Sequence, residues 1–172
     1  MRKPIAQLRT SRLLLDRVSS DDLDDFVCFY ADPLVTATLG GVREPTWVTS
    51  YLHRQVEHWE RHGFGFWTVR DPAIRQFIGR GGLRHATIAG RTEIEVGYGL
   101  MSEFWGRGLA TELALESVRV AFEVLDFRQV VSFTLPSNVA SRRVMEKAGF
   151  EYDCDVVHAD LPHVLFRQTR IH

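Results

Sequence analysis

Hydrophobic and polar residues repeat along this chain with two different periods, and the changes between them predict its elements. Apolar or period-two runs, which are typical of strands, occupy residues 10–18, 64–71, 76–86, 92–100 and 129–135, with two more between 151 and 171. Capping signals predict helices from Ser19 or Ser20 to 32, from Thr46 to Gly63, from Gly108 to about Asp126, and between Pro136 and Gly149. The order of these elements predicts a mixed α/β fold in one domain over residues 1–172.

The strand over 92–100, "TEIEVGYGL", divides its side chains into two unlike faces. By alternation, one face holds Ile94, Val96, Tyr98 and Leu100, and the other holds Glu93, Glu95, Gly97 and Gly99. Glycine within a strand often marks the close approach of a ligand or of another backbone. The second face is therefore either a half-exposed surface with solvated glutamates and a bulge, or a face cleared for a ligand. We interpret the glycines of "GRGG" at 79–82 as a strand bulge.

The stretch "EFWGRGLATEL" places two glycines at the start of the long predicted helix. The first N–H groups of a helix have no internal partner, and the helix dipole is positive at that end. Because Gly106 and Gly108 lack Cβ atoms, a phosphate could reach these N–H groups, and Arg107 could add a charge. The alternative is a tight turn that glycine merely permits.

Composition limits the partners more than it identifies them. The chain has 172 residues with a formal charge of -1, so it has no general attraction to nucleic acid or to an anionic membrane. Cys28 and Cys154 lack metal-ligand spacing and are expected to be buried thiols, and no metal site is expected. No apolar run suits a signal peptide or a membrane span. We expect a soluble cytoplasmic protein.

Two motifs together resemble a known family. "EFWGRGLATEL" followed by "SNVASRRVMEKAGF" is similar to the GCN5-related N-acetyltransferase superfamily, in particular its RimJ/RimL-like ribosomal-protein acetyltransferase branch. The coenzyme loop of the superfamily reads Gln/Arg-x-x-Gly-x-Gly/Ala; here Trp105 stands first, and Gly108 and Ala110 are kept. The resemblance implies a mostly antiparallel sheet of six to seven strands with about four helices, whose fourth and fifth strands splay to admit acetyl-CoA as cosubstrate.

The resemblance also implies a coenzyme site. The thioester would lie beside the backbone from Val96 through Tyr98 and Leu100 to Met101. The pyrophosphate would lie on the amides of Arg107, Gly108, Leu109, Ala110 and Thr111. Asn138 would contact the pantetheine arm. Further candidates for the phosphates are Arg107, Arg142, Arg143 and Lys147, although solvated helix charges are the commoner role of such residues.

Acetyl transfer to an amine needs a base, and the thiolate that leaves needs a proton. Glu95 is our choice of base, with Glu93 in reserve and His85 third. The tyrosine that many superfamily members carry in the last helix is Met145 here, so that acid is lacking. Ser141 resembles a serine that the branch places near the thiol sulfur; it either donates to the thiolate or lies on the helix surface, in which case water supplies the proton.

The acceptor is the least defined partner. In the superfamily the first two helices line its pocket, so five aromatic residues are either wall or core: Trp47, Tyr51, Phe64, Phe66 and Trp67. A protein or peptide N-terminal α-amine fits the branch by analogy. A small-molecule amine and a non-catalytic acyl-CoA sensor stay as alternatives. The chain is expected to be a monomer, or a homodimer paired through edge strands of its tail.

Overall fold

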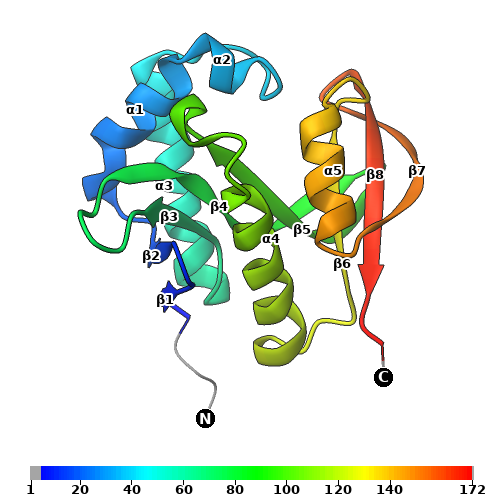
Figure 1. Cartoon of the computed structure of the whole chain (residues 1–172). Helices are drawn as coiled ribbons and strands as arrows, with labels where there is room; N and C mark the ends of the chain where they lie inside the picture. The colour runs from blue at the N-terminus through cyan, green and yellow to red at the C-terminus, as the bar shows by residue number, and fades with distance from the viewer. Residues whose placement is uncertain (1–4, 172) are drawn as a thin grey trace.

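The computed structural model describes residues 5–171 and contains one mixed sheet (Figure 1). Its strands run in the order β1-β2-β3-β4-β5-β6-β8-β7. All neighbours are antiparallel except β5 and β6, which are parallel. The strands are β1 (Gln7–Arg9), β2 (Leu14–Arg17), β3 (Phe66–Arg70), β4 (Phe77–Ile88), β5 (Arg91–Leu100), β6 (Gln129–Thr134), β7 (Glu151–His158) and β8 (Leu161–Thr169).

Helices cover both faces of this sheet. They are α1 (Leu23–Ala31), α2 (Pro33–Thr36), α3 (Pro45–His62), α4 (Leu109–Arg119) and α5 (Val139–Lys147), with single turns at Ser20–Asp22, Ser102–Phe104 and Val120–Val124. In Figure 1, α4 and α5 lie in front of the sheet and α3 lies behind it. Two close approaches define the faces: Leu113 of α4 packs over Gly81, and Phe29 of α1 packs over Gly99. We call these the α4 face and the α1 face.

The predicted α/β class and element order are confirmed, with two differences at the N-terminal side. The strand predicted over 10–18 is shorter, Leu14–Arg17, because Thr10 and Leu13 form a turn in which the Thr10 amide donates to the Leu13 carbonyl. A further strand, β1, precedes this turn, so the sheet has eight strands among the described residues instead of the six to seven expected. The prediction that Thr46 caps α3 is wrong: Glu44 is the N-cap, and Pro45 takes the first helical position, where its fixed φ suits the helix. Gly63 ends α3 as predicted, with φ 73°.

The glycines at 79–82 serve close packing rather than forming the bulge themselves. The bulge precedes them, since Val69 pairs with Gly79 and Arg70 pairs with Phe77, which leaves Ile78 as the extra residue. A Cβ on Gly81 would lie 2.6 Å from the Gly97 carbonyl oxygen of β5. The sequence-based expectation placed the bulge slightly too far along the chain.

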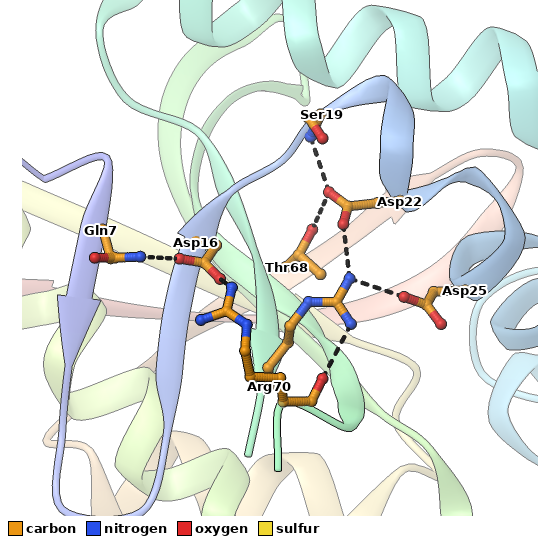
Figure 2. Close-up of polar contacts among 8 residues, drawn as sticks. Gln7, Asp16, Ser19, Asp22, Asp25, Thr68 and Arg70 are labelled. Carbon is orange, nitrogen blue, oxygen red and sulfur yellow. Dashed lines mark hydrogen bonds and ion pairs between the residues drawn. The ribbon is translucent and has the colours of Figure 1, made fainter. Parts of the chain in front are cut away.

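A network of charged side chains anchors α1 to the sheet (Figure 2). Asp22 accepts hydrogen bonds from the Ser19 amide, the Thr68 hydroxyl and the Arg70 guanidinium at 2.7–2.9 Å. Arg70 also pairs with Asp25 at 2.8 Å. A surface pocket beside this network is lined by charged and polar residues, several of which pair with one another: Asp16, Arg17, Ser19, Asp21, Asp22, Arg70 and Arg75.

The expectation of two buried thiols is wrong. Both cysteines are free and exposed. Cys28 lies on the outer side of α1, whose inward positions are Phe26, Phe29 and Tyr30, and Cys154 lies on the edge strand β7. Among residues 5–171, no helix combines the length and the apolar character that a membrane crossing requires.

Candidate active site

The sheet opens between β5 and β6. These parallel strands share a single ladder pair, Glu95 with Val131. The next contact across the gap is made by a side chain, because the Ser132 hydroxyl donates to the Val96 carbonyl at 2.9 Å. Peptide groups along a strand point alternately to its two edges. Since Val96 faces the gap, Tyr98 faces it too, at a level where the β5–β6 ladder has ended.

Glu95 stands where this separation begins, with its side chain on the α1 face. The residue is 6% exposed. Its Oε2 accepts from Arg84 Nε at 2.6 Å, because β4 and β5 form a hairpin that places the two residues opposite each other. Burial acts against the charged guanidinium, but the ion pair with Glu95 raises the pKa of Arg84. Glu95 Oε1 makes no hydrogen bond to any residue between 5 and 171, so this oxygen is available to a ligand.

The glycine positions on this face are occupied by aromatic rings. A Cβ on Gly97 would lie 2.6 Å from Phe66 Cζ, and one on Gly99 would lie 2.9 Å from Phe29 Cζ. The face was expected to be either a solvated surface or a surface cleared for ligand. It is instead a buried layer of aromatic and charged side chains, and Glu95 Oε1 lies 3.1 Å from the Gly97 Cβ position within it.

The other two candidate bases are already engaged elsewhere. Glu93 lies on the same face as Glu95, but both of its oxygens pair with Arg167 of β8, at 3.0 and 3.1 Å. His85 pairs with Ile94 across the hairpin, and Ile94 belongs to the α4 face. Its side chain therefore points away from Glu95, and it contacts His58 at 3.2 Å.

A pair of hydroxyl groups bridges the gap on the α4 face. The Tyr98 hydroxyl lies 3.0 Å from Ser141 Oγ and donates to the Ser141 carbonyl at 3.1 Å. Ser141 stands in the first turn of α5, whose N-cap is Asn138. Burial raises the pKa of Tyr98 to about 12, so this phenol keeps its proton near neutral pH. Met145, which stands where many members of the superfamily have a tyrosine, is buried in the core.

The loop before α4 has the geometry of an anion site. Gly106 and Gly108 have φ of 71° and 76°, a left-handed region that favours glycine. Gly108 is the N-cap of α4, and no side chain of residues 5–171 caps this end. The first amides of a helix have no intrahelical partner, and here they are those of Leu109, Ala110 and Thr111. Within the described part of the chain, no atom lies within 4 Å of the Cβ position of Gly106, and Arg12 Nη2 alone, at 3.6 Å, approaches that of Gly108.

Residues 12–151, which include this loop and the strands on both sides of the gap, match a family model described as an acetyltransferase (GNAT) domain. The chain belongs to the GNAT acetyltransferase family. It is 26% identical to the Bacillus subtilis protein YkkB over 148 residues, which are 83% of this chain and 86% of that one. GNAT acetyltransferases use acetyl-CoA, so acetyl-CoA is the acetyl donor of this enzyme.

Solved structures agree on the GNAT fold. An acetyltransferase from Agrobacterium tumefaciens superposes with a TM-score of 0.85 at 26% identity, covering 99% of this chain and 98% of its own. The aminoglycoside acetyltransferase AAC(6')-Ib in complex with coenzyme A has a TM-score of 0.76 at 22% identity, with 92% and 95% covered. A Vibrio cholerae protein assigned as a ribosomal-protein-serine acetyltransferase has the same TM-score at 14% identity, with 98% and 99% covered.

The residues expected to hold acetyl-CoA in this GNAT domain lie around one gap. Val96, Tyr98 and Leu100 present their peptide groups to it, while the Met101 amide is turned away and donates to the Ile78 carbonyl at 2.8 Å. The Leu100 carbonyl accepts from Trp105 Nε1 at 2.9 Å. This bond ties the loop before α4 to the end of β5.

The polar side chains predicted on α5 are partly used by the protein. Asn138 Oδ1 caps the helix by accepting from the Ser141 amide, and its Nδ2 donates to Thr134. The second N–H of Asn138 Nδ2 makes no hydrogen bond to a residue between 5 and 171. Arg142 donates to the Pro136 carbonyl at 3.2 Å. Arg143 and Lys147 are exposed.

Arg12 lies at the loop before α4, and the sequence did not suggest it. Its Nη1 donates to the Arg107 carbonyl at 2.8 Å, and its Nε pairs with Glu112 at 2.7 Å. Burial would raise the pKa of Glu112, but hydrogen bonds from Thr10 and Arg12 lower it. Arg12 thus fixes the loop against the first turn of α4 and adds positive charge beside Gly108. No spacing in the sequence connects it to a loop 95 residues away.

Of the five aromatic residues proposed for the acceptor wall, three lie on the α1 side. Phe66 covers Gly97. Trp47 stacks on Tyr51, and Tyr51 packs edge-on against Tyr30, both with centroids 5.2 Å apart. Trp67 is core on the other face, with its Nε1 bonded to the Ile5 carbonyl. Phe64 packs with His58 and His85.

Three histidines gather at the C-terminal end of α3. Ring nitrogens of His58, His62 and His85 lie within 4.8 Å of one another, a donor set of the kind that transition metals use. His58 Nε2 already accepts from the His85 backbone amide at 3.2 Å. A metal ion would have to displace this hydrogen bond.

Proposed function

We propose that this enzyme transfers the acetyl group of acetyl-CoA to a primary amine by direct attack of the amine on the thioester, with Glu95 as the base. The observation that carries the proposal is a buried carboxylate with one free oxygen, placed where β5 and β6 separate. Arg84 holds Glu95 Oε2, so Oε1 is the atom that takes the amine proton.

Tyr98 and Ser141 are assigned to the polarised thioester carbonyl and the leaving thiolate. The amide of Tyr98 faces the open edge of β5 and can donate to the developing oxyanion. The C–N bond forms as the C–S bond breaks, and the sulfur leaves as a thiolate. Because Tyr98 holds its own proton firmly, we assign Ser141 and Tyr98 to hydrogen bonding with the thiolate, which then takes its proton from water.

The phosphates of the coenzyme are assigned to the start of α4. The free amides of Leu109, Ala110 and Thr111 with the helix dipole supply the main attraction, and Arg12 and Arg107 add positive charge beside them. Asn138, the N-cap of α5, is assigned to the pantetheine arm. Arg143 of α5 is assigned to the phosphates. These assignments account for a site that binds a polyanion in a chain whose formal charge is -1.

For the acceptor we propose a peptide or protein α-amine, which has support from the likeness in fold to the Vibrio cholerae protein. A small-molecule amine is the second candidate, and the likeness to AAC(6')-Ib, solved with kanamycin in one of its complexes, favours it to a similar degree. Both likenesses concern the fold.

The test is a thiol-release assay on Glu95→Gln with Glu93→Gln as the matched control. Glu93 lies two residues away on the same face but is bound to Arg167. Glu95→Gln should lower kcat by about 100-fold or more with an unchanged dissociation constant for acetyl-CoA, while Glu93→Gln should keep kcat within a few-fold. Equal losses in both variants, or full activity in Glu95→Gln, would refute the assignment of the base.

A further inference from the structure

Strands β3 and β4 carry three arginines on the α1 face of the sheet, and among residues 5–171 only two of the three have a carboxylate partner. Arg70 pairs with Asp22 and Asp25 (Figure 2), and Arg84 pairs with Glu95. For Arg80, no carboxylate of residues 5–171 lies within 4.0 Å. Yet Arg80 is the most buried of the three, with 7% of its surface exposed. Arginine is rarely buried to this extent without a counterion.

The groups around Arg80 do not neutralise it. Its Nε and Nη2 both donate to one acceptor, the Tyr30 hydroxyl, at 3.3 and 3.2 Å. Burial raises the pKa of Tyr30, so this phenol is neutral. The remaining neighbours are aromatic rings, with the guanidinium carbon 5.5 Å from the Phe29 centroid and 5.1 Å from that of Phe66. These rings favour a cation but do not cancel its charge.

The buried carboxylate Asp22 is already saturated. It belongs to the same region of the fold as Arg80, because it bonds to Thr68, the β3 residue paired with Arg80. Both of its oxygens are taken, one by Arg70 and the other by Ser19 and Thr68 (Figure 2). Two further buried polar atoms of the same region, Tyr51 Oη and Arg43 Nε, have no hydrogen-bond partner among the described residues. The protein therefore leaves buried donors unmatched here.

The coenzyme is not the missing anion. Its phosphates are assigned to the start of α4, and α4 packs on the opposite face of the sheet, where Leu113 covers Gly81. Strand β5 also lies between Arg80 on β4 and the gap beside β6. An anion that reaches Arg80 must come from the α1 side, the side of Glu95.

We propose, given the acetyltransferase function above, that the acceptor amine carries a carboxylate a few bonds from its nitrogen, and that Arg80 binds this carboxylate. Arg80 Nη1 makes no hydrogen bond to a described residue. It lies 3.7 Å from the Cβ position of Gly99, as Glu95 Oε1 lies 3.1 Å from that of Gly97. These positions are two residues apart on one strand face, about 7 Å.

The Cβ positions near these two groups set the scale of the site. With hydrogen bonds of about 2.8 Å at each end, an amine and a carboxylate joined through one or two carbons span a distance of about 7 Å. A free α- or β-amino acid has this chemistry, and so does a peptide whose first residue is aspartate. An aminoglycoside does not, because it brings several positive charges and no anion to a site that already has an unmatched cation.

The experiment compares acceptors that differ only in the carboxylate. The pairs are β-alanine with β-alaninamide, and a tripeptide that begins with Asp with one that begins with Asn. Each is assayed by thiol release with the wild type, Arg80→Met and Arg70→Lys. The wild type should favour the acid over its amide by about 10- to 100-fold in kcat/KM, and the pair that shows this preference identifies the source as free amino acid or peptide. Arg80→Met should lose the preference, whereas Arg70→Lys should keep it.

A direct binding measurement covers the case in which these acceptors are poor substrates. Thermal unfolding is followed with coenzyme A and β-alanine or the Asp-initiated peptide. A carboxylate-dependent rise in Tm in the wild type that is absent in Arg80→Met supports the proposal. Turnover of neutral or polycationic amines alone, or a carboxylate preference that survives in Arg80→Met, overturns it but leaves the acetyltransferase function standing. Absence of both turnover and a carboxylate-dependent rise in Tm overturns it as well. Failure of the acetyltransferase function itself would appear instead as no thiol release with any amine.

Discussion

Gly97→Ala tests whether the glycines of β5 exist to admit aromatic rings. A Cβ at this position would lie 2.6 Å from Phe66 Cζ, so the ring must move by about 1 Å to reach ordinary contact. Phe66 is 1% exposed and lies between the guanidinium groups of Arg80 and Arg84, at 5.1 and 5.0 Å. Overpacking of this kind costs about 1–3 kcal/mol.

The backbone itself does not oppose alanine at Gly97, because its φ is not in the left-handed region. There, alanine in place of glycine gains about 0.4–1 kcal/mol by restricting the unfolded chain. We therefore expect a net loss of about 1–2 kcal/mol in the free energy of unfolding, measured by urea denaturation with tryptophan fluorescence. The catalytic rate should also fall, since Glu95 Oε1 lies 3.1 Å from the new methyl group.

A double-mutant cycle with Phe66→Leu isolates the clash. Leucine is shorter, so it should relieve the contact with the methyl group introduced by Gly97→Ala, and the double variant should be more stable than the sum of the two single losses by about 1 kcal/mol. Additive losses, within about 0.5 kcal/mol, would show that the Gly97–Phe66 contact is not what destabilises Gly97→Ala, and the packing explanation would be refuted.

Two further predictions concern the coenzyme loop and the histidine cluster. Gly108→Ala and Gly63→Ala both place alanine at a left-handed φ, 76° and 73°, so both should lower the free energy of unfolding by about 1 kcal/mol. Only Gly108→Ala should weaken acetyl-CoA binding in calorimetry. Equal affinity in the two variants would contradict the loop assignment. Burial lowers the pKa of His58 from 6.5 to about 4, so the unfolded ring binds its proton first, and stability should be present above pH 6.5 and fall as the pH drops towards 4. The full pKa shift corresponds to about 3 kcal/mol, and the expected effect is about 1–2 kcal/mol because the ring is half-buried and partly screened. Urea titrations of the wild type and His58→Asn at pH 7 and 4.5 should show a smaller loss in the free energy of unfolding for the variant. Equal losses in the two proteins would contradict the role of His58.

Local signals in the sequence predicted the parts of the site that lie within one element. Alternation along β5 placed Glu95 on the face opposite Val96 and Tyr98, and the structure agrees. The glycines at 106 and 108 predicted an uncapped helix start, which is observed. These features depend on the period of a strand and on the chemistry of a helix end, and neither needs a distant residue.

Features that depend on strand register were missed, although one signal for them was present. Ala89 and Gly90, both with positive φ, form a two-residue turn between β4 and β5, and such a turn fixes the pairing of the whole hairpin. Recognition of that turn would have placed Arg84 opposite Glu95 and Arg80 opposite Gly99. The pairing of Glu93 with Arg167 spans 74 residues, and no local pattern could have revealed it.

The balance of charge on the α1 face connects the base to the acceptor. Before reaction, Glu95 offsets Arg84, and Arg80 is the unmatched cation of this buried layer. When Glu95 takes the amine proton it becomes neutral, so the guanidinium groups of both Arg80 and Arg84 then lack a counterion. A carboxylate on the acceptor offsets one of them during this step, and a neutral acceptor does not. If both proposals hold, the carboxylate stabilises the transition state as well as the bound substrate, and its removal should lower kcat in addition to raising KM. A change in KM alone would mean that Arg80 serves only to bind.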